Sequence, residues 1–346
     1  MKHFEAAFAT WVVNNRLKVI ALSILLIIVP GTGLSKLYFD ASYRVYFGED
    51  NPQLADLEAI EAIYTENHNV LIVVAPKNGD VFTASTLQAI EELTDAAWQV
   101  PYSRRVDSIT NFQYTYAEED DLIVQDMAKN ASTYTPDQLL AVKKAVLGEP
   151  ALLRRLISES GHVTGVNITL SMPEDELTTA TPAIAKDARK IAKELEQRYP
   201  DLKTYISGVV MLDNSFSESA INDFTHLVPI SFVLMMGLIS ILVGGIAGTL
   251  VTMIIIIASV IAAMGTIGYI GFPLTAMSTS GPIIILTVAV ANCVHVLVSF
   301  VYGLSKGESK TEAMEESLRI NLQPVFLASA TTAIGFTSMN FSDVPP

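Results

Sequence analysis

Three polar residues near the C-terminal end of the chain could do chemistry in an apolar setting. The stretch TVAVANCVHVLVSF (287–300) places Asn292, His295 and Ser299 at positions i, i+3 and i+7, which share one face of a helix. The surrounding segment 224–305 contains no Asp, Glu, Lys or Arg. Because a histidine changes charge near neutral pH, this face is a candidate path for protons or another ion.

The same face has a second interpretation. An Asn or His between membrane helices often forms a hydrogen bond between them that contributes about 1 kcal/mol, although ionisable residues inside a membrane are functional candidates by default. Four hydroxyls further along the chain could face the pair: Ser329, Thr331, Thr332 and Ser338. Hydroxyls in a helix also bond to their own backbone, so the sequence leaves both interpretations open.

Long apolar segments predict the helices that hold these residues. A helix needs roughly 20 apolar residues to cross the hydrocarbon layer of a membrane. Five segments meet this requirement: 17–35, 227–246, 249–271, 282–303 and 322–341. The first could be a cleaved signal peptide, but no small-residue cleavage site follows it, so a membrane anchor is favoured. Glycines 237, 244, 245, 248, 265, 268 and 271 predict close helix packing.

Positive charge near the ends of the spans predicts their orientation. Lys2, Arg16 and Lys18 place the N-terminus in the cytoplasm. Alternation then puts the block 37–225 outside the cell membrane and the loop 303–321 inside. That loop has the pattern of a short amphipathic helix, which we expect to lie along the membrane surface as a connector.

The block 37–225 has the composition of a soluble domain. It holds 15 Lys and Arg against 30 Asp and Glu, and this acidity excludes nucleic acid as a partner. Apolar patterns predict strands at 69–76, 104–111, 162–172 and 201–208, with helices from Thr83 and over 136–147, 149–158 and 175–198. Two strand–helix–strand units predict a small α/β domain of the split βαβ kind.

No pattern in the chain predicts an enzyme. His68 and His162 have no carboxylate or Cys at ligand spacing, so we expect neither a metal site nor a cofactor. The acidic cluster EEDD (118–121) reads as a solvated loop. The single Cys293 lies two residues before His295, on a different helix face, and no nucleophile–His–acid set accompanies it.

Three motifs resemble the MmpL/Patched-like branch of the resistance–nodulation–division (RND) superfamily of transporters. TTAIGFTSMNFSDVPP (331–346) resembles the fifth-span signature of that branch, which ends in a Ser-Asp-x-Pro-Pro-like turn. The segment 289–336 resembles the fourth span, the basic loop after it and the Pro-containing start of the next span. YRVYFGEDNPQLADLEAIEAIYTENHNVLIVV (43–74) resembles the start of the first outer domain. In Patched and sterol-handling relatives, spans two to six are called a sterol-sensing domain.

The resemblance implies an α-helical polytopic membrane bundle with an inserted extracytoplasmic α/β domain of the porter-like kind. Its parts are a cytoplasmic segment with the first span (1–36), the outer domain (37–225) and spans two to five (226–346). The family repeat has a sixth span and a second half, which this sequence would lack. The fourth span of the superfamily usually carries the ionisable residue of a proton relay, often Asp, at about the place of Asn292. Because Asn cannot take up a proton, His295 is the titratable candidate there.

The resemblance also implies a function. It predicts a multi-pass protein of the inner cell membrane that exports hydrophobic or lipid-like molecules, driven by protons or another ion. Its partners would be that substrate, the coupling ion and the second half of the same protein, and the resemblance permits a homo-oligomer or a periplasmic partner protein. The alternative is a sterol- or lipid-sensing or sorting protein that does not transport.

Overall fold

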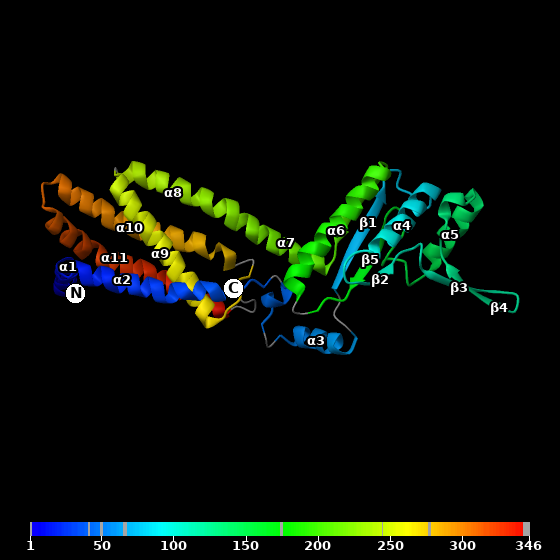
Figure 1. Ribbon diagram of the computed structural model, residues 1–346, viewed down its shortest axis with the longest axis horizontal. Coiled ribbons are helices and arrows are strands. Elements are labelled where there is room, and N and C mark those ends of the chain that lie inside the picture. The colour runs from blue at the N-terminus through cyan, green and yellow to red at the C-terminus, as the bar shows by residue number, and fades with distance from the viewer. Residues whose placement is uncertain are drawn as a thin grey trace. The chain divides into compact units, whose positions relative to one another are not determined.

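The computed structural model describes residues 2–40, 42–48, 51–64, 68–173, 176–243, 245–275 and 278–341 (Figure 1). It divides into two compact units. One is Asp50–Phe216, and the other combines Met1–Glu49 with Ser217–Pro346. The predicted motif residues 342–346 lie outside the described residues.

The unit Asp50–Phe216 is built around an antiparallel sheet. Its strands are β1 (His68–Pro76), β2 (Ser103–Asp107), β5 (Thr164–Leu170) and β6 (Leu202–Ser207). Their order is β2-β5-β1-β6, with every neighbouring pair antiparallel. Helix α4 (Ala84–Ala97) joins β1 to β2, and α6 (Leu177–Arg198) joins β5 to β6. The two strand–helix–strand units are therefore interleaved in one sheet, which confirms the predicted split βαβ topology.

Alternation along the strands gives this unit its core. Val70, Ile72 and Val74 of β1 are fully buried, and the residues between them are only partly buried. The helices bury matching stripes, such as Leu87, Ile90 and Leu93 of α4, and α4 and α6 also pack against each other. The two helices thus cover one face of the sheet. Helix α5 (Pro136–Gly148) was also predicted, and its N-terminus is closed by a capping box between Thr135 and Gln138.

Three features of the unit differ from the sequence prediction. The predicted helix at 149–158 is wrong, because turns and isolated bridges occupy this segment and Arg154 has a left-handed φ of 64°. Helix α3 (Pro52–Tyr64) was not predicted. The strands β3 (Gln113–Glu118) and β4 (Asp121–Asp126) form a hairpin that was also missed. The acidic residues 118–121 therefore form the tip of this hairpin.

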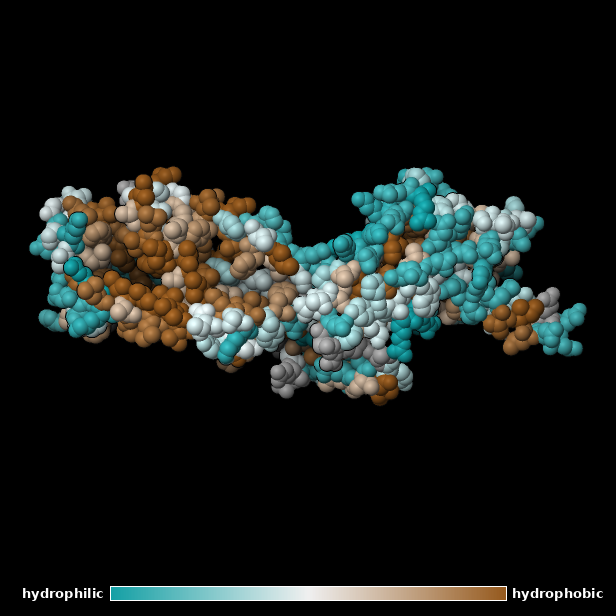
Figure 2. Space-filling model, viewed as in Figure 1, coloured by the Kyte–Doolittle hydropathy of each residue, from teal (hydrophilic) through white to brown (hydrophobic). Residues whose placement is uncertain are grey.

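The other unit is a bundle of apolar helices. Its helices are α1 (Lys2–Asn14), α2 (Arg16–Gly31), α8 (Val228–Val243), α9 (Ile246–Ile270), α10 (Gly281–Ser305) and α11 (Lys310–Ser338). Helix α7 (Val209–Asn222) and the π-helical turn η5 (Asp223–Leu227) lead into α8. Apolar side chains dominate the visible surface of these helices (Figure 2).

Within the described residues, four helical segments are long and apolar enough to cross a membrane. They are Arg16–Lys36, Val209–Ile241, Ile246–Ile270 and Ser278–Ser305. They match four of the five predicted spans. The fifth, 322–341, lies mostly in α11 and does not reach the same apolarity, because Gln323, Ser329 and Thr331 interrupt it. That span stays a prediction.

The segment 303–321 is not a separate surface helix, so that prediction is wrong. Helix α11 starts at Lys310, capped by Ser309 and Glu312, and continues without a break past Pro324. Ala313, Ser317 and Asn321 recur every four residues and are buried. The Cβ that a side chain at Gly303 of α10 would add would lie 2.9 Å from the Ala313 Cβ. The start of α11 therefore folds back along α10.

Glycines allow the first and third spans to meet at backbone distance. A Cβ added at Gly265 of α9 would lie 2.0 Å from the Pro30 carbonyl oxygen of α2. A Cβ at Gly268 would lie 2.1 Å from the carbonyl oxygen of Gly33, in the 3-10 turn η1 (Thr32–Lys36). The predicted role in close helix packing is confirmed at these two positions. It is wrong for Gly237, Gly245 and Gly271, because no atom of the described residues lies within 4 Å of a Cβ added at any of them.

The glycine contact gives a first prediction. Gly265→Ala should destabilise the protein by about 1–3 kcal/mol, because the new methyl group meets backbone atoms that cannot rotate away. Thermal unfolding of the detergent-solubilised protein measures this effect as a lower Tm. Gly237→Ala is the control and should leave Tm unchanged or raise it slightly, since Ala favours a helix. Equal Tm values for the two variants would contradict the assigned contact.

Candidate functional site

Hydrogen bonds between α10 and α11 bring several of the predicted polar residues together. Asn292 Nδ2 of α10 donates to Ser329 Oγ of α11 at 3.4 Å. The hydroxyl of Ser299 donates to the backbone carbonyl of His295, 3.1 Å away. Ser299 Oγ in turn accepts a hydrogen bond from Asn321 Nδ2 of α11. Asn292 and Ser299 therefore lie on the side of α10 along which α11 runs.

The two predicted threonines of α11 do not join this network. Thr331 Oγ1 donates to the carbonyls of Leu327 and Ala328, and Thr332 Oγ1 donates to that of Ala328. Both hydroxyls thus find their hydrogen-bond acceptors in the backbone of their own helix, as Ser and Thr in membrane helices commonly do. The Ser338 hydroxyl likewise donates to the Gly335 carbonyl of its own helix. Of the four hydroxyls of α11 considered from the sequence, only Ser329 bonds to the Asn292–His295 pair in the described part of the chain.

His295 differs from its neighbours. Its side chain is exposed on the surface of the unit, and its imidazole makes no hydrogen bond to any described residue. A histidine that served only to join two helices would have a partner on the second helix. The geometry therefore leaves the imidazole accessible to water, an ion or another part of the protein.

Two polar residues that the sequence prediction missed hold α11 against α10. Asn321 is 6% exposed, and its Nδ2 donates to Ser299 Oγ at 2.8 Å and to the Ser317 carbonyl at 2.9 Å. Ser317 is 1% exposed and donates to the Val296 carbonyl at 2.6 Å. The sequence contains a pattern that indicates this contact, because the buried Ala313, Ser317 and Asn321 repeat at the spacing of one helix face. The contact was missed because the segment was predicted to be a connector on the membrane surface.

The opposite side of α10 contacts α9. The Cys293 side chain lies near Thr252 of α9, which is fully buried and donates to the Gly248 carbonyl. Cys293 therefore lies on a different face from His295, as the spacing predicted. No three His, Cys, Asp or Glu side chains gather to bind a metal ion within the described ranges.

Charged groups of α11 lie in its first turns. A hydrogen bond from Arg319 holds the pKa of Glu316 below its usual range, and their ion pair has an N–O distance of 2.5 Å. Hydrogen bonds from the Ser309 side chain and backbone lower the pKa of Glu312. After Arg319 the described part of α11 carries no charged residue. The helix thus changes from a charged start to an apolar remainder within one turn of Asn321.

The buried amide gives a second prediction. Asn321→Ala should cost about 1–2 kcal/mol, because it removes the bond to Ser299 from the contact between α10 and α11. Asn292→Ala, which loses only a half-exposed bond of 3.4 Å, should cost no more than about 0.5 kcal/mol. Thermal unfolding in detergent measures both. The assignment of Asn321 as the main link would be refuted by a larger loss in Asn292→Ala.

Comparison of this chain with known proteins identifies its family. Residues 46–346 match the model of the MMPL family. The membrane protein YdgH of Bacillus subtilis (strain 168) is 24% identical over 181 residues, which cover 49% of this chain and 20% of YdgH. The crystal structure of a heavy metal efflux pump matches 92% of this chain and 46% of its own, with 10% identity and a TM-score of 0.34.

This chain spans less than half the length of both relatives. The family match covers most of this chain and includes all the elements that form the candidate site. Together with the apolar helices, it describes a multi-pass membrane protein. The chain belongs to the MMPL family.

Proposed function

We propose that the chain forms part of an RND-type exporter that moves hydrophobic or lipid-like molecules and couples this movement to protons or another ion. Membership of the MMPL family supports the transporter class. The observation that carries the coupling is His295, a titratable side chain without a hydrogen-bond partner among the described residues, in a segment free of charged residues. No cofactor is part of this proposal.

In the proposed mechanism, His295 takes up and releases the proton. An added charge on this face of α10 favours water or a carboxylate nearby and disfavours lipid. Asn292 and Ser299, on the same face, are bonded to α11. A change in the surroundings of His295 therefore acts first on the contact between α10 and α11. The hydroxyls of Thr331 and Thr332 donate their protons to backbone carbonyls of α11. In this mechanism their oxygen atoms accept hydrogen bonds from a protonated group or water further along the helix.

One continuous helix supplies a mechanical connection. The helical segment Val209–Ile241 starts directly after β6 of the unit Asp50–Phe216 and ends within the apolar bundle. It contains the π-helical turn Asp223–Leu227, a distortion that is frequent at functional sites. We infer that a displacement of α8 reaches the sheet of the α/β unit through this helix, with the π-helical turn as the point of bending.

An alternative function is lipid or sterol sensing without transport. Asn292 favours it, because this side chain cannot take up a proton at any relevant pH. In that case the bundle would bind a lipid and the helix Val209–Ile241 would report its presence. Further partners that we propose for the exporter are the remaining part of a longer protein and either a second copy or a periplasmic protein.

The coupling proposal predicts the effect of changing His295. In the full-length protein, both His295→Ala and His295→Gln should abolish energy-dependent efflux of the hydrophobic dye Nile red from cells, because neither side chain can titrate. Val298→Ala, one turn away on α10, is the control and should retain efflux. Equal amounts of each variant in the membrane confirm folding. Normal efflux by the Gln variant together with loss in the Ala variant would show that His295 serves packing only.

The proposed orientation predicts which residues face the outside of the cell. Ser132 and Ser305 are both exposed on their own units, and each can be replaced by Cys in a Cys293→Ala background. In intact cells, a membrane-impermeant maleimide should label Ser132→Cys and leave Ser305→Cys unlabelled until the cells are opened. Labelling of Ser305→Cys in intact cells would reverse the proposed inner-membrane topology with 37–225 outside.

A further inference from the structure

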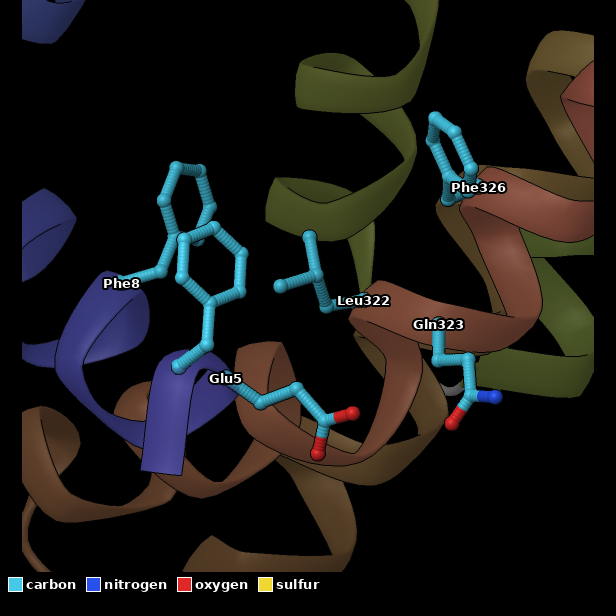
Figure 3. Close-up of a pocket in the computed structure, with 6 residues that line it drawn as sticks. Glu5, Phe8, Leu322, Gln323 and Phe326 are labelled. Carbon is cyan, nitrogen blue, oxygen red and sulfur yellow. The ribbon is translucent and has the colours of Figure 1, made fainter. Parts of the chain in front are cut away.

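The N-terminal helix α1 was not predicted, and it encloses a pocket together with α11. The pocket has a volume of about 260 Å³ and is lined by Phe4, Glu5, Phe8, Leu322, Gln323 and Phe326 (Figure 3). This is below the roughly 300–1,000 Å³ of sites for drug-sized ligands. Its size suits a narrow chain better than a compact molecule.

Helix α1 is firmly held beside the pocket. It packs along α11, where Ala9 is almost completely buried, and Thr10 Oγ1 donates to the Glu315 carboxylate at 3.4 Å. The rings of Phe4 and Phe8 stack with their centroids 6.2 Å apart. The pocket therefore lies between two docked helices and is not a gap beside a loose terminus.

Polar and apolar groups are separated around the pocket. In Figure 3 the ring of Phe8 and the side chain of Leu322 lie on one side, whereas the Glu5 carboxylate and the Gln323 amide point to the other. Arg319 lies one turn before Gln323, close enough to Glu5 for their attraction to add to the effect of Glu316 in raising the pKa of Arg319. The polar side thus carries the Glu5 carboxylate, and the Arg319 guanidinium, which is bonded to Glu316, lies one turn before the pocket on α11.

The apolar side is continuous with the surface that faces lipid in a membrane protein. Phe326 is 67% exposed, and Leu327 beside it is also exposed, on the part of α11 that follows the last charged residue. On α1, Phe4 and Trp11 are exposed as well. Tryptophan gathers where a membrane meets water, and an amphipathic helix with Trp and Phe on its apolar face can lie in that plane.

We propose that this pocket holds one acyl chain of a zwitterionic phospholipid from the leaflet on the N-terminal side of the membrane. The chain lies against Phe4, Phe8, Leu322 and Phe326. The ammonium group of the lipid lies beside Glu5, and its phosphate lies beside Arg319. The bound lipid fixes α1 in the membrane plane and stabilises the start of α11. This inference rests on the membrane orientation proposed above and is independent of transport.

Fluorescence quenching tests the proposal with the full chain. The protein has two tryptophans, so Trp11→Phe and Trp98→Phe give a background without them. Phe8→Trp or Phe326→Trp then places a probe in either wall of the pocket, and Leu26→Trp on the exposed surface of α2 is the control for lipid contact. Each protein is reconstituted into vesicles of phosphatidylcholine that contain a fraction brominated in mid-chain.

Quenching of both pocket probes should equal or exceed that of Leu26→Trp. Brominated phosphatidylcholine should quench about two- to fivefold more effectively than brominated phosphatidylglycerol in mixed vesicles, the range expected for one exposed ion pair. Glu5→Lys should remove or reverse this preference while leaving mid-chain quenching in place.

Two results would overturn the proposal. Quenching of the pocket probes by aqueous iodide but not by brominated lipid would show that water fills the pocket. Equal quenching by both lipids, unaffected by Glu5→Lys, would show that no head group is selected. Weak quenching of Leu26→Trp as well would instead refute the membrane orientation, so that the two failures can be told apart.

Discussion

The helices of this protein obey one constraint, which is that a polar group in hydrocarbon must find its partner within the protein. Many hydroxyls of the bundle meet this constraint by donating to a backbone carbonyl of their own helix. Thr252, Thr266 and Thr287, for example, each donate to the carbonyl four residues earlier. Amides cannot be satisfied so completely on their own helix. Asn292 and Asn321 therefore reach between α10 and α11, and this requirement sets the register of the two helices. His295 is the exception, because the described residues give its imidazole no partner, and an exception to a strict constraint is where function is expected.

Two kinds of contact divide the bundle into parts of different stiffness. The first and third spans touch through backbone atoms at Gly265 and Gly268. Beyond this contact, the Lys36 ammonium lies 4.5 Å above the ring of Tyr269, and the Leu274 amide donates to the Tyr38 carbonyl at 2.8 Å. Close-packed backbones cannot slide without a clash. Helices α10 and α11 also meet closely at Gly303 and Ala313, but side-chain hydrogen bonds from Asn292, Ser317 and Asn321 link them as well, and such bonds can exchange partners. In the proposed mechanism, a charge at His295 would act on the contact between α10 and α11, while α2 and α9 would serve as a fixed support.

The sequence predicted those features whose signal lies in one periodic pattern. The strands β1, β2, β5 and β6 have strong apolar patterns, and their split βαβ order followed. The hairpin β3–β4 was missed because its strands are short and largely exposed, so that they lack a core-facing pattern. The segment 149–158 was predicted as a helix, but the left-handed backbone at Arg154 has no signal in that residue type. At the site, the spacing of Asn292, His295 and Ser299 was readable. The bond between Ser299 and Asn321 depends on the path of α11, which no local pattern specifies.

Because Asn292 cannot bind or release a proton, any proton coupling on this face of α10 depends on His295 and on the groups that surround it. In contact with lipid alone, a histidine stays neutral, since a low-dielectric environment disfavours its charged form. It then cannot carry a proton, and the bundle could only sense a ligand. Beside water or a carboxylate, both protonation states become accessible, and proton movement can drive the exchange of hydrogen bonds between α10 and α11. The same α10 face thus supports transport or sensing according to what lies against one imidazole. Since one fold can serve both functions, the groups that surround His295 decide between transport and sensing.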